Sequence, residues 1–179
     1  FRSSRMIFGN VLIADLNRDA GGADPYESDA VTLGGIDKTV RSGTEEGHVF
    51  ASIRAENVGE AFDCFQDNCY VGAVIGRGLT NFGVKFIHGA QNNIVNRVDI
   101  DGYRVAGILF AGSGTSTRHC DGNKVLGGRI AGADSSNADA APVHFQDSGA
   151  GTASVPKRNL VDGVEFFGES TSDYVIRSN

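Results

Sequence analysis

A short apolar block recurs along the chain, at a nearly constant distance from a second apolar block upstream of it. The offset between the two is 13 residues from Val49 to Phe62, Val71 to Val84, Val95 to Ile108 and Val161 to Tyr174, and 18 residues from Val125 to Val143. The step from one downstream block to the next varies between 22 and 35 residues. A fixed offset inside a repeat of varying length confines insertions to one connection, which is how solenoid proteins behave.

Three of the upstream blocks begin with asparagine, over residues 93–100, 123–130 and 159–166. Asparagine suits the start of a strand after a turn, because its amide bonds backbone groups and it tolerates left-handed geometry. β-Branched and aromatic residues alternate in these blocks, which predicts strands of two to five residues. No stretch of 11 or more residues keeps a helical apolar period, so we expect few helices.

The shortest step of 22 residues fits one coil of three short strands joined by turns. Leucine-rich and calcium-binding nonapeptide patterns are absent, and an antiparallel sandwich would not explain the 13-residue offset. We therefore expect an all-β, right-handed, single-stranded parallel β-helix of five to six coils. It would form one domain over residues 1–179, with an N-terminal coil and long acidic loop over 1–47 and regular coils over 48–179. No polar end cap is recognisable, so we expect a segment of a longer helix or an oligomer.

Composition excludes several classes of protein. The chain has 16 basic and 22 acidic residues and a net charge of -6, which argues against nucleic-acid binding. The chain contains no run of 18 apolar residues, so we expect no membrane span. Cys64, Cys69 and Cys120 make no disulfide framework, and no further cysteine or histidine follows at zinc-ligand spacing, so we expect no metal site of that kind.

The rhythm of residues 93–98 leading to Gly107 and Ile108, repeated after Asn123 and Asn159, resembles the pectin-lyase-like superfamily of right-handed β-helices. The resemblance covers roughly residues 48–179 and lies in rhythm rather than in a catalytic signature. It implies an extracellular protein or one at a virion or cell surface. The superfamily includes polysaccharide lyases, uronan epimerases, glycoside hydrolases and bacteriophage tailspikes, so the activity has to be argued from a site.

Polar residues should gather on one face of the stacked strands. Equivalent residues of successive coils lie about 4.8 Å apart in a parallel stack. One outward column is then predicted to contain Thr32, Asp63, Lys85, Leu109 and His144, and a column at the strand ends Gln66, His88, Gly112 and Asp147. Asp63, Lys85, His88, Gln66, His144 and Asp147 would converge there.

Two interpretations of this face remain open. In the first, Asp63 and Lys85 form a solvated cross-strand ion pair and the histidines are turn residues. In the second, the face is a groove for an acidic polysaccharide, where removal of a uronate C5 proton needs a base, a neutralising cation and an acid. Lys85 would be base or neutraliser, His88 or His144 acid or base, with Asp63 orienting Lys85.

Other residues complete this picture. Gln66 and Asp147 would bind substrate, while a hydrolase would need Asp63 paired with Asp67 or Asp147 across the scissile bond. Arg104 could bind a substrate carboxylate and Tyr103 could stack on a sugar ring. The alternative is that both residues only form a turn between strands.

The acidic segment 15–29 leaves calcium open as a cofactor. Asp15, Asp19, Asp24 and Glu27 supply the hard oxygen ligands that this ion prefers. The EF-hand spacing is absent, however, and a long loop explains the segment equally well. No other cofactor is expected.

Two functions follow. The first is a carbohydrate-active protein that binds or cleaves an extracellular, uronate-containing polysaccharide as a lyase or epimerase. The alternative is a non-catalytic tailspike or adhesin shaft with receptor contacts, for which a homotrimer is a natural assembly.

Overall fold

The computed structural model describes residues 5–16, 28–34, 47–112, 119–137, 139–147, 155–167 and 177–178. All regular structure within these ranges is β-strand, and none of them contains a helix long and apolar enough to cross a membrane. The strands are β1 (Ile7–Ala14), β2 (Thr32–Leu33), β3 (Val49–Glu56), β4 (Phe62–Cys64), β5 (Tyr70–Arg77), β6 (Phe82–Phe86), β7 (Ile94–Val95), β8 (Val98–Tyr103), β9 (Ala106–Ala111), β10 (Lys124–Ala133), β11 (Ala141–Gln146), β12 (Leu160–Phe167) and β13 (Arg177–Ser178). The prediction of an all-β chain is confirmed.

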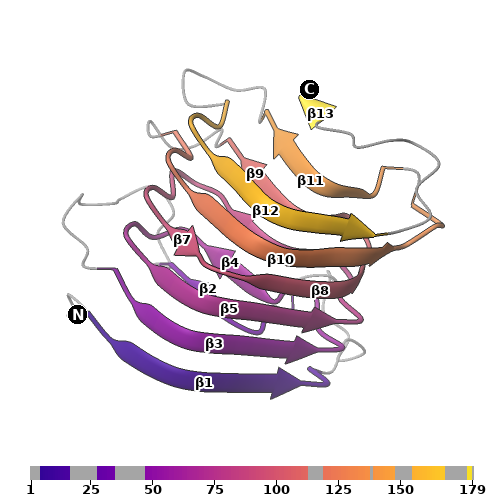
Figure 1. Cartoon of the computed structure of the whole chain (residues 1–179), viewed down its shortest axis with the longest axis horizontal. Coiled ribbons are helices and arrows are strands. Elements are labelled where there is room, and N and C mark those ends of the chain that lie inside the picture. Colours follow the sequence, from indigo (N-terminus) through magenta and orange to yellow (C-terminus); the bar gives the residue numbers. More distant parts are fainter. Residues whose placement is uncertain are drawn as a thin grey trace.

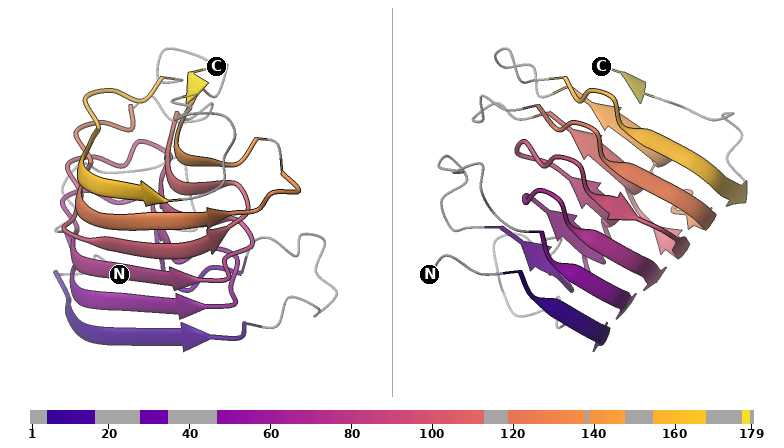
Figure 2. Two further views of the ribbon diagram at one scale, coloured as in Figure 1. Left: turned by 45° about the vertical axis from the view of Figure 1, so that its right-hand side comes forward. Right: turned by 60° about the vertical axis from the view of Figure 1, so that its left-hand side comes forward.

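The strands form two sheets, and every pairing between the described strands is parallel. The first sheet has the order β1-β3-β5-β7-β10-β12, with β8 also pairing β5 and β10. The second has the order β2-β4-β6-β9-β11-β13. The long, bent strands of the first sheet lie across from the short strands of the second, one level above another (Figures 1 and 2). The core lies between the two sheets.

Strand lengths differ from the prediction. β3 and β5 each span eight residues and β10 spans ten, where two to five were expected. These strands continue around the bend of the first sheet, which breaks only between β7 and β8. Gly128 keeps β10 continuous there: its φ is 105°, and a Cβ at this position would lie 1.9 Å from the carbonyl oxygen of Val98.

The predicted register of the second sheet is confirmed over its four central strands. Phe62 pairs with Val84, Val84 with Ile108 and Ile108 with Val143, all of them buried. The column two residues further along is aromatic: Phe86, Phe110 and Phe145 stack with ring centroids 5.5 Å and 5.0 Å apart. Stacked apolar columns therefore fill the core on this side.

Two predicted positions need correction. Phe50, and not Val49, pairs with Val71, because the Phe50 ring is buried against the stacked ring of Phe8. Tyr174 lies outside the described residues. His144 pairs with Arg177, whereas the repeated offset predicts Val175 at that place, so the last strand lies two residues further along the chain.

A ladder of asparagines runs along the turn that enters the first sheet, with Asn93 and Asn123 buried and Asn159 half-buried. The Asn93 backbone N–H and Nδ2 donate to Oδ1 of Asn123 at 3.1 and 2.8 Å, and the same two groups of Asn123 each donate to Oδ1 of Asn159 at 2.9 Å. The Cys69 N–H donates to Oδ1 of Asn93 at 2.8 Å, and the Met6 N–H donates to Nδ1 of His48 at 3.2 Å. The levels of Cys69, Asn93, Asn123 and Asn159 are thus tied together by side chains that satisfy backbone N–H groups, and His48 does the same for the level of Met6.

The left-handed residue of this turn lies one position before the asparagine. Asn92, Gly122 and Arg158 have φ values of 56°, 67° and 51°. The expected backbone bonding by the asparagine amides is confirmed, while the left-handed geometry belongs to their neighbours.

The ladder predicts that Asn123→Ala destabilises the protein by about 3 kcal/mol. Asn123 is fully buried, and its loss leaves the Asn93 N–H without its partner, at roughly 1–3 kcal/mol, and also removes one of the two hydrogen bonds that the Ala90 carbonyl accepts. Urea unfolding measures this cost. The exposed Asn96→Ala is the control and should change the free energy of unfolding by less than about 0.5 kcal/mol. Equal effects of the two variants would contradict the role of the ladder.

Candidate functional site

Adjacent strands of the second sheet bring Asp63 of β4 and Lys85 of β6 together. The two residues are paired in register, and Lys85 Nζ lies 3.2 Å from Asp63 Oδ2. The ammonium group also contacts Oε1 and Oε2 of Glu60 at 3.0 and 2.9 Å. The predicted Asp63–Lys85 ion pair is therefore present. The carboxylate of Glu60, which was not predicted, also contacts the lysine.

Glu60 is placed by a bridge that precedes β4. Asp29 and Glu60 form an isolated parallel bridge, and the Ala30 N–H donates to the Glu60 carbonyl at 2.8 Å. Extending the Thr32–Asp63 register back by three residues gives this same pair, so the sequence did contain the signal. Asn81 Nδ2 donates to Glu60 Oε1 at 3.0 Å. The carboxylates of Asp29, Glu60 and Asp63 offer oxygens within 4.8 Å of one another.

Two carboxyl groups in the cluster of Asp29, Glu60, Asp63 and Lys85 are buried, and the pKa values of Glu60 and Lys85 are shifted. Glu60 and Asp63 are 1% and 2% exposed. Burial, reinforced by the negative charge of Asp63, raises the pKa of Glu60 to about 8 despite the nearby ammonium. Burial disfavours the charged form of Lys85, but the attraction of Asp63 and Glu60 outweighs it and the pKa of Lys85 rises.

These shifts decide between the chemical roles expected for Lys85. A lysine with a raised pKa carries its proton at neutral pH and cannot accept another, so the geometry favours a neutralising role over that of a base. Its ammonium is already held by the carboxyl groups of Glu60 and Asp63. The first interpretation, an ion pair, describes the contacts, although the pair is buried rather than solvated.

The histidines lie apart from this cluster. His144 of β11 is two strands from Lys85, about 10 Å along the sheet, with the buried Leu109 paired between them. His88 has a φ of 53° in the turn after β6, and its ring meets Phe65 edge-on with centroids 5.2 Å apart. The predicted convergence of Lys85 with both histidines is therefore only partial: the outward column has the expected register, but its members are spread along the sheet.

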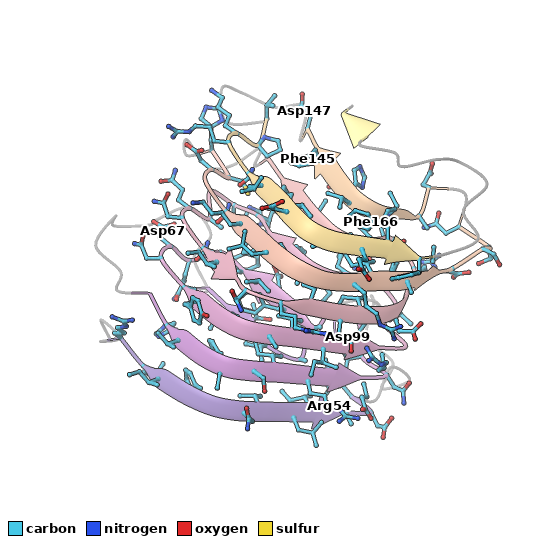
Figure 3. The ribbon with its side chains drawn as sticks, viewed as in Figure 1. Arg54, Asp67, Asp99, Phe145, Asp147 and Phe166 are labelled. Atoms are coloured by element: carbon cyan, nitrogen blue, oxygen red, sulfur yellow. The ribbon has the colours of Figure 1, made fainter. Side chains whose placement is uncertain are left out.

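Of the remaining predicted site residues, Gln66 and Asp67 form hydrogen bonds between neighbouring turns. The Gln66 carbonyl accepts from Asn93 Nδ2 at 2.8 Å, and Asp67 Oδ1 accepts from the Gln91 N–H at 2.9 Å. Asp67 and Asp147 lie at different levels of the stack, Asp147 directly after β11 (Figure 3).

Tyr103 and Arg104 favour the structural interpretation. Tyr103 ends β8 rather than lying in the connection, and its ring is only 4% exposed, so burial raises its pKa to about 12. A ring in the core offers no open face for a sugar. The Arg104 carbonyl accepts from Asn137 Nδ2 at 2.7 Å, which anchors the bend after β8.

The residues proposed to bind calcium are only partly described. Asp19, Asp24 and Glu27 lie outside the described residues, and Asp15 Oδ1 accepts from Asn57 Nδ2 at 2.8 Å. Among the described residues, Asp29, Glu60 and Asp63 could offer oxygens to a hard cation. The Lys85 ammonium already supplies positive charge to two of the three.

A second group of charges lies on the outer face of the first sheet. Asp99 of β8 accepts from Arg77 Nη2 at 2.8 Å and Arg129 Nε at 2.9 Å, and Arg129 also lies 3.6 Å from Asp101. Asp99 and Arg54 mark this face in Figure 3. Residues of opposite charge alternate between neighbouring strands, which the sequence analysis did not predict.

No family model, curated protein or solved structure matches the chain. The fold and the contacts described above are therefore the basis for any functional assignment.

Because the pKa of Glu60 is raised, we expect the free energy of unfolding to fall as the pH rises. Its folded-state pKa of about 8 lies above the ordinary 4.5, so its contribution is fully present below pH 4.5 and is lost as the pH rises through 8. Thermal unfolding between pH 5 and pH 9 should show this decline, and Glu60→Gln should reduce it. The exposed Glu165→Gln should leave the decline unchanged; an identical profile for wild type and Glu60→Gln would contradict this account.

We expect removal of the Lys85 charge to lower the free energy of unfolding strongly. Lys85→Met leaves the buried Asp63 without its cation and Glu60 without a hydrogen-bond donor, which costs about 3–5 kcal/mol of unfolding free energy near neutral pH. Denaturant unfolding measures this change. The exposed Lys124→Met should alter stability by less than about 0.5 kcal/mol, and a similarly small effect at Lys85 would show that the cluster contributes little.

Proposed function

We propose that the two sheets are walls of one right-handed parallel β-helix, and that this helix is a non-catalytic shaft segment of an extracellular or surface-exposed protein, of the tailspike or adhesin type. The chain alternates between the sheets from β1 to β6, and successive strands of each sheet are parallel. Crossovers between parallel strands of a sheet are right-handed in nearly all known cases. The asparagine ladder supports a stack of repeating coils, because it links equivalent positions of four successive levels.

The closed charge cluster is the observation that carries the non-catalytic assignment. A catalytic acid or base must reach its substrate, whereas Glu60 and Asp63 are buried and hold Lys85 between them. His144 lies two strands from Lys85 along the sheet, with Leu109 between them, and the His88 ring packs against Phe65 in the turn after β6. The charged side chains thus support folding, and the long regular sheets supply a rigid body.

A second candidate is a lyase or epimerase acting on a uronate-containing polysaccharide. One observation favours it: Glu60, with a pKa near 8, titrates close to neutral pH and lies in contact with a protonated lysine. A carboxyl group of that kind can transfer a proton, and the lysine can neutralise a carboxylate. The chemistry would require the cluster to open toward a sugar.

Incubation with a panel of uronans separates the two candidates. Lyase products absorb ultraviolet light through the C=C bond formed by elimination, and epimerase products change the sugar's proton NMR spectrum. We expect neither signal with any polymer. A signal that disappears in both Lys85→Arg and Glu60→Gln, with unfolding midpoints preserved, would overturn the shaft assignment and establish the enzyme.

A further inference from the structure

The turn between β4 and β5 contains two cysteines whose thiol groups contact each other. Cys64 ends β4 and Cys69 directly precedes β5, with four residues between them. The Cys64 thiol donates to the Gln66 carbonyl and the Cys69 thiol to the Asp67 carbonyl, each at 3.6 Å. The two thiols are also hydrogen-bonded to each other, and both side chains are buried. The two sulfur atoms therefore face each other across one short turn, as a disulfide requires.

Each cysteine departs from the residue type of its column, and the two departures fall in the same turn. Cys69 stands where the three later levels of the ladder have asparagine, and its N–H donates to Oδ1 of Asn93 in the same way. In the second sheet, the register places Cys64 in a column of large apolar side chains, Leu33, Phe86, Phe110 and Phe145. A cysteine in one column alone would pack as a small apolar residue, whereas two that meet in one turn form a pair.

The backbone of this turn is held in place by the next level of the stack. The Gln66 carbonyl accepts from Asn93 Nδ2 at 2.8 Å. The Asn68 N–H donates to the Gln91 carbonyl at 2.9 Å, and Asp67 Oδ1 accepts from the Gln91 N–H at 2.9 Å. These contacts keep the two sulfur atoms at a high effective concentration, which favours a bond between them over two separate thiols.

We propose that Cys64 and Cys69 form a disulfide bond that staples this turn when the chain folds in oxidising surroundings. The oxidising surroundings rest on the extracellular or surface location of the proposed function, because disulfides form and persist there. One local bond of this kind differs from a framework of several bridges, which three cysteines do not provide. Cys120 keeps its thiol, which donates to the Phe86 carbonyl at 3.4 Å and accepts from Asn123 Nδ2 at 3.3 Å.

The bond forms by exchange with a small disulfide such as oxidised glutathione. The thiolate of one cysteine attacks that disulfide, forms a mixed disulfide and releases one reduced glutathione. The thiolate of the other cysteine then attacks the protein sulfur of the mixed disulfide and releases a second one. The two cysteines lose two electrons to the glutathione, and each leaving thiolate takes up one of the two protons. Because burial raises the pKa of the Cys64 thiol, the exchange is fast only while the turn is open during folding.

Refolding in a mixture of oxidised and reduced glutathione, followed by alkylation under denaturing conditions, tests the pairing. Cleavage after lysine and arginine leaves Cys64 and Cys69 together in residues 55–77 and Cys120 in residues 119–124. We expect the first peptide to carry no alkyl label and the second to carry one. Two labels on residues 55–77, or a cross-link between the two peptides, would overturn the proposal.

Single variants test whether each cysteine has the partner proposed for it. Cys64→Ala should leave Cys69 labelled, and Cys69→Ala should leave Cys64 labelled, because neither retains a thiol to bond with. Cys120→Ala is the matched control and should leave residues 55–77 without label. Loss of the bond in Cys120→Ala, or an unlabelled Cys69 in Cys64→Ala, would contradict the pairing.

Reduction of the bond should destabilise the folded chain. A disulfide that closes so short a loop is expected to raise the equilibrium constant for folding by about 10- to 50-fold. Urea unfolding of the refolded wild type with and without reductant measures this factor, and the double variant Cys64→Ala with Cys69→Ala should not respond to reductant. An unchanged unfolding midpoint on reduction of a bonded wild type would contradict the role as a staple.

Failure of this inference is distinguishable from failure of the proposed function, because the refolding experiment sets the redox conditions itself. Free thiols at Cys64 and Cys69 in a folded chain that leaves uronans unchanged would refute the disulfide and preserve the shaft assignment. Uronan products from a chain with the bond formed would refute the shaft assignment and preserve the disulfide.

Discussion

Parallel pairing in register is the constraint on which the rest of this structure depends. Because each strand lies directly above an equivalent one, every side chain has a counterpart about 4.8 Å away in the next level. A column is stable only if its members tolerate that proximity. Phe86, Phe110 and Phe145 meet the condition by stacking their rings, and the asparagines meet it by donating and accepting along the column. Charged residues meet it by alternating in sign, as around Asp99 and Arg129.

The same constraint explains why the charged cluster is closed. Asp63 must lie next to Lys85, and Asp29 next to Glu60, once the second sheet is in register. The buried Glu60 and Asp63, which lie beside the half-buried Asp29, need a cation, and Lys85 supplies it. The cost of burying these groups appears in the raised pKa of Glu60. The charges therefore follow from the packing of the stack, which supports a structural function over a catalytic one.

The sequence predicted the second sheet well because its register depends on a local pattern. Phe62, Val84, Ile108 and Val143 each follow a small or helix-unfavourable residue at the start of a short strand, and alternation then fixes which side chains point inward. The first sheet was harder: at Val49 two apolar residues are adjacent, and only the stacking of Phe50 on Phe8 selects between them. Strand length and the burial of Tyr103 depend on the bend and on neighbouring levels, which no local pattern contains. Glu60 was missed because the bridge that places it lies outside any strand.

The most direct test of the parallel stack is a spin-label distance between Ile7 and Leu160. Both are exposed, and they belong to one column whose successive members are Ile7, Val49, Tyr70, Ile94, Lys124 and Leu160. The five steps place their backbones about 24 Å apart. The native cysteines are buried, so labels at Ile7→Cys and Leu160→Cys can be attached selectively, and dilution with unlabelled protein removes distances between copies. A single narrow distribution near that distance, allowing for the label tethers, is expected; a broad distribution or a much longer distance would contradict the stack.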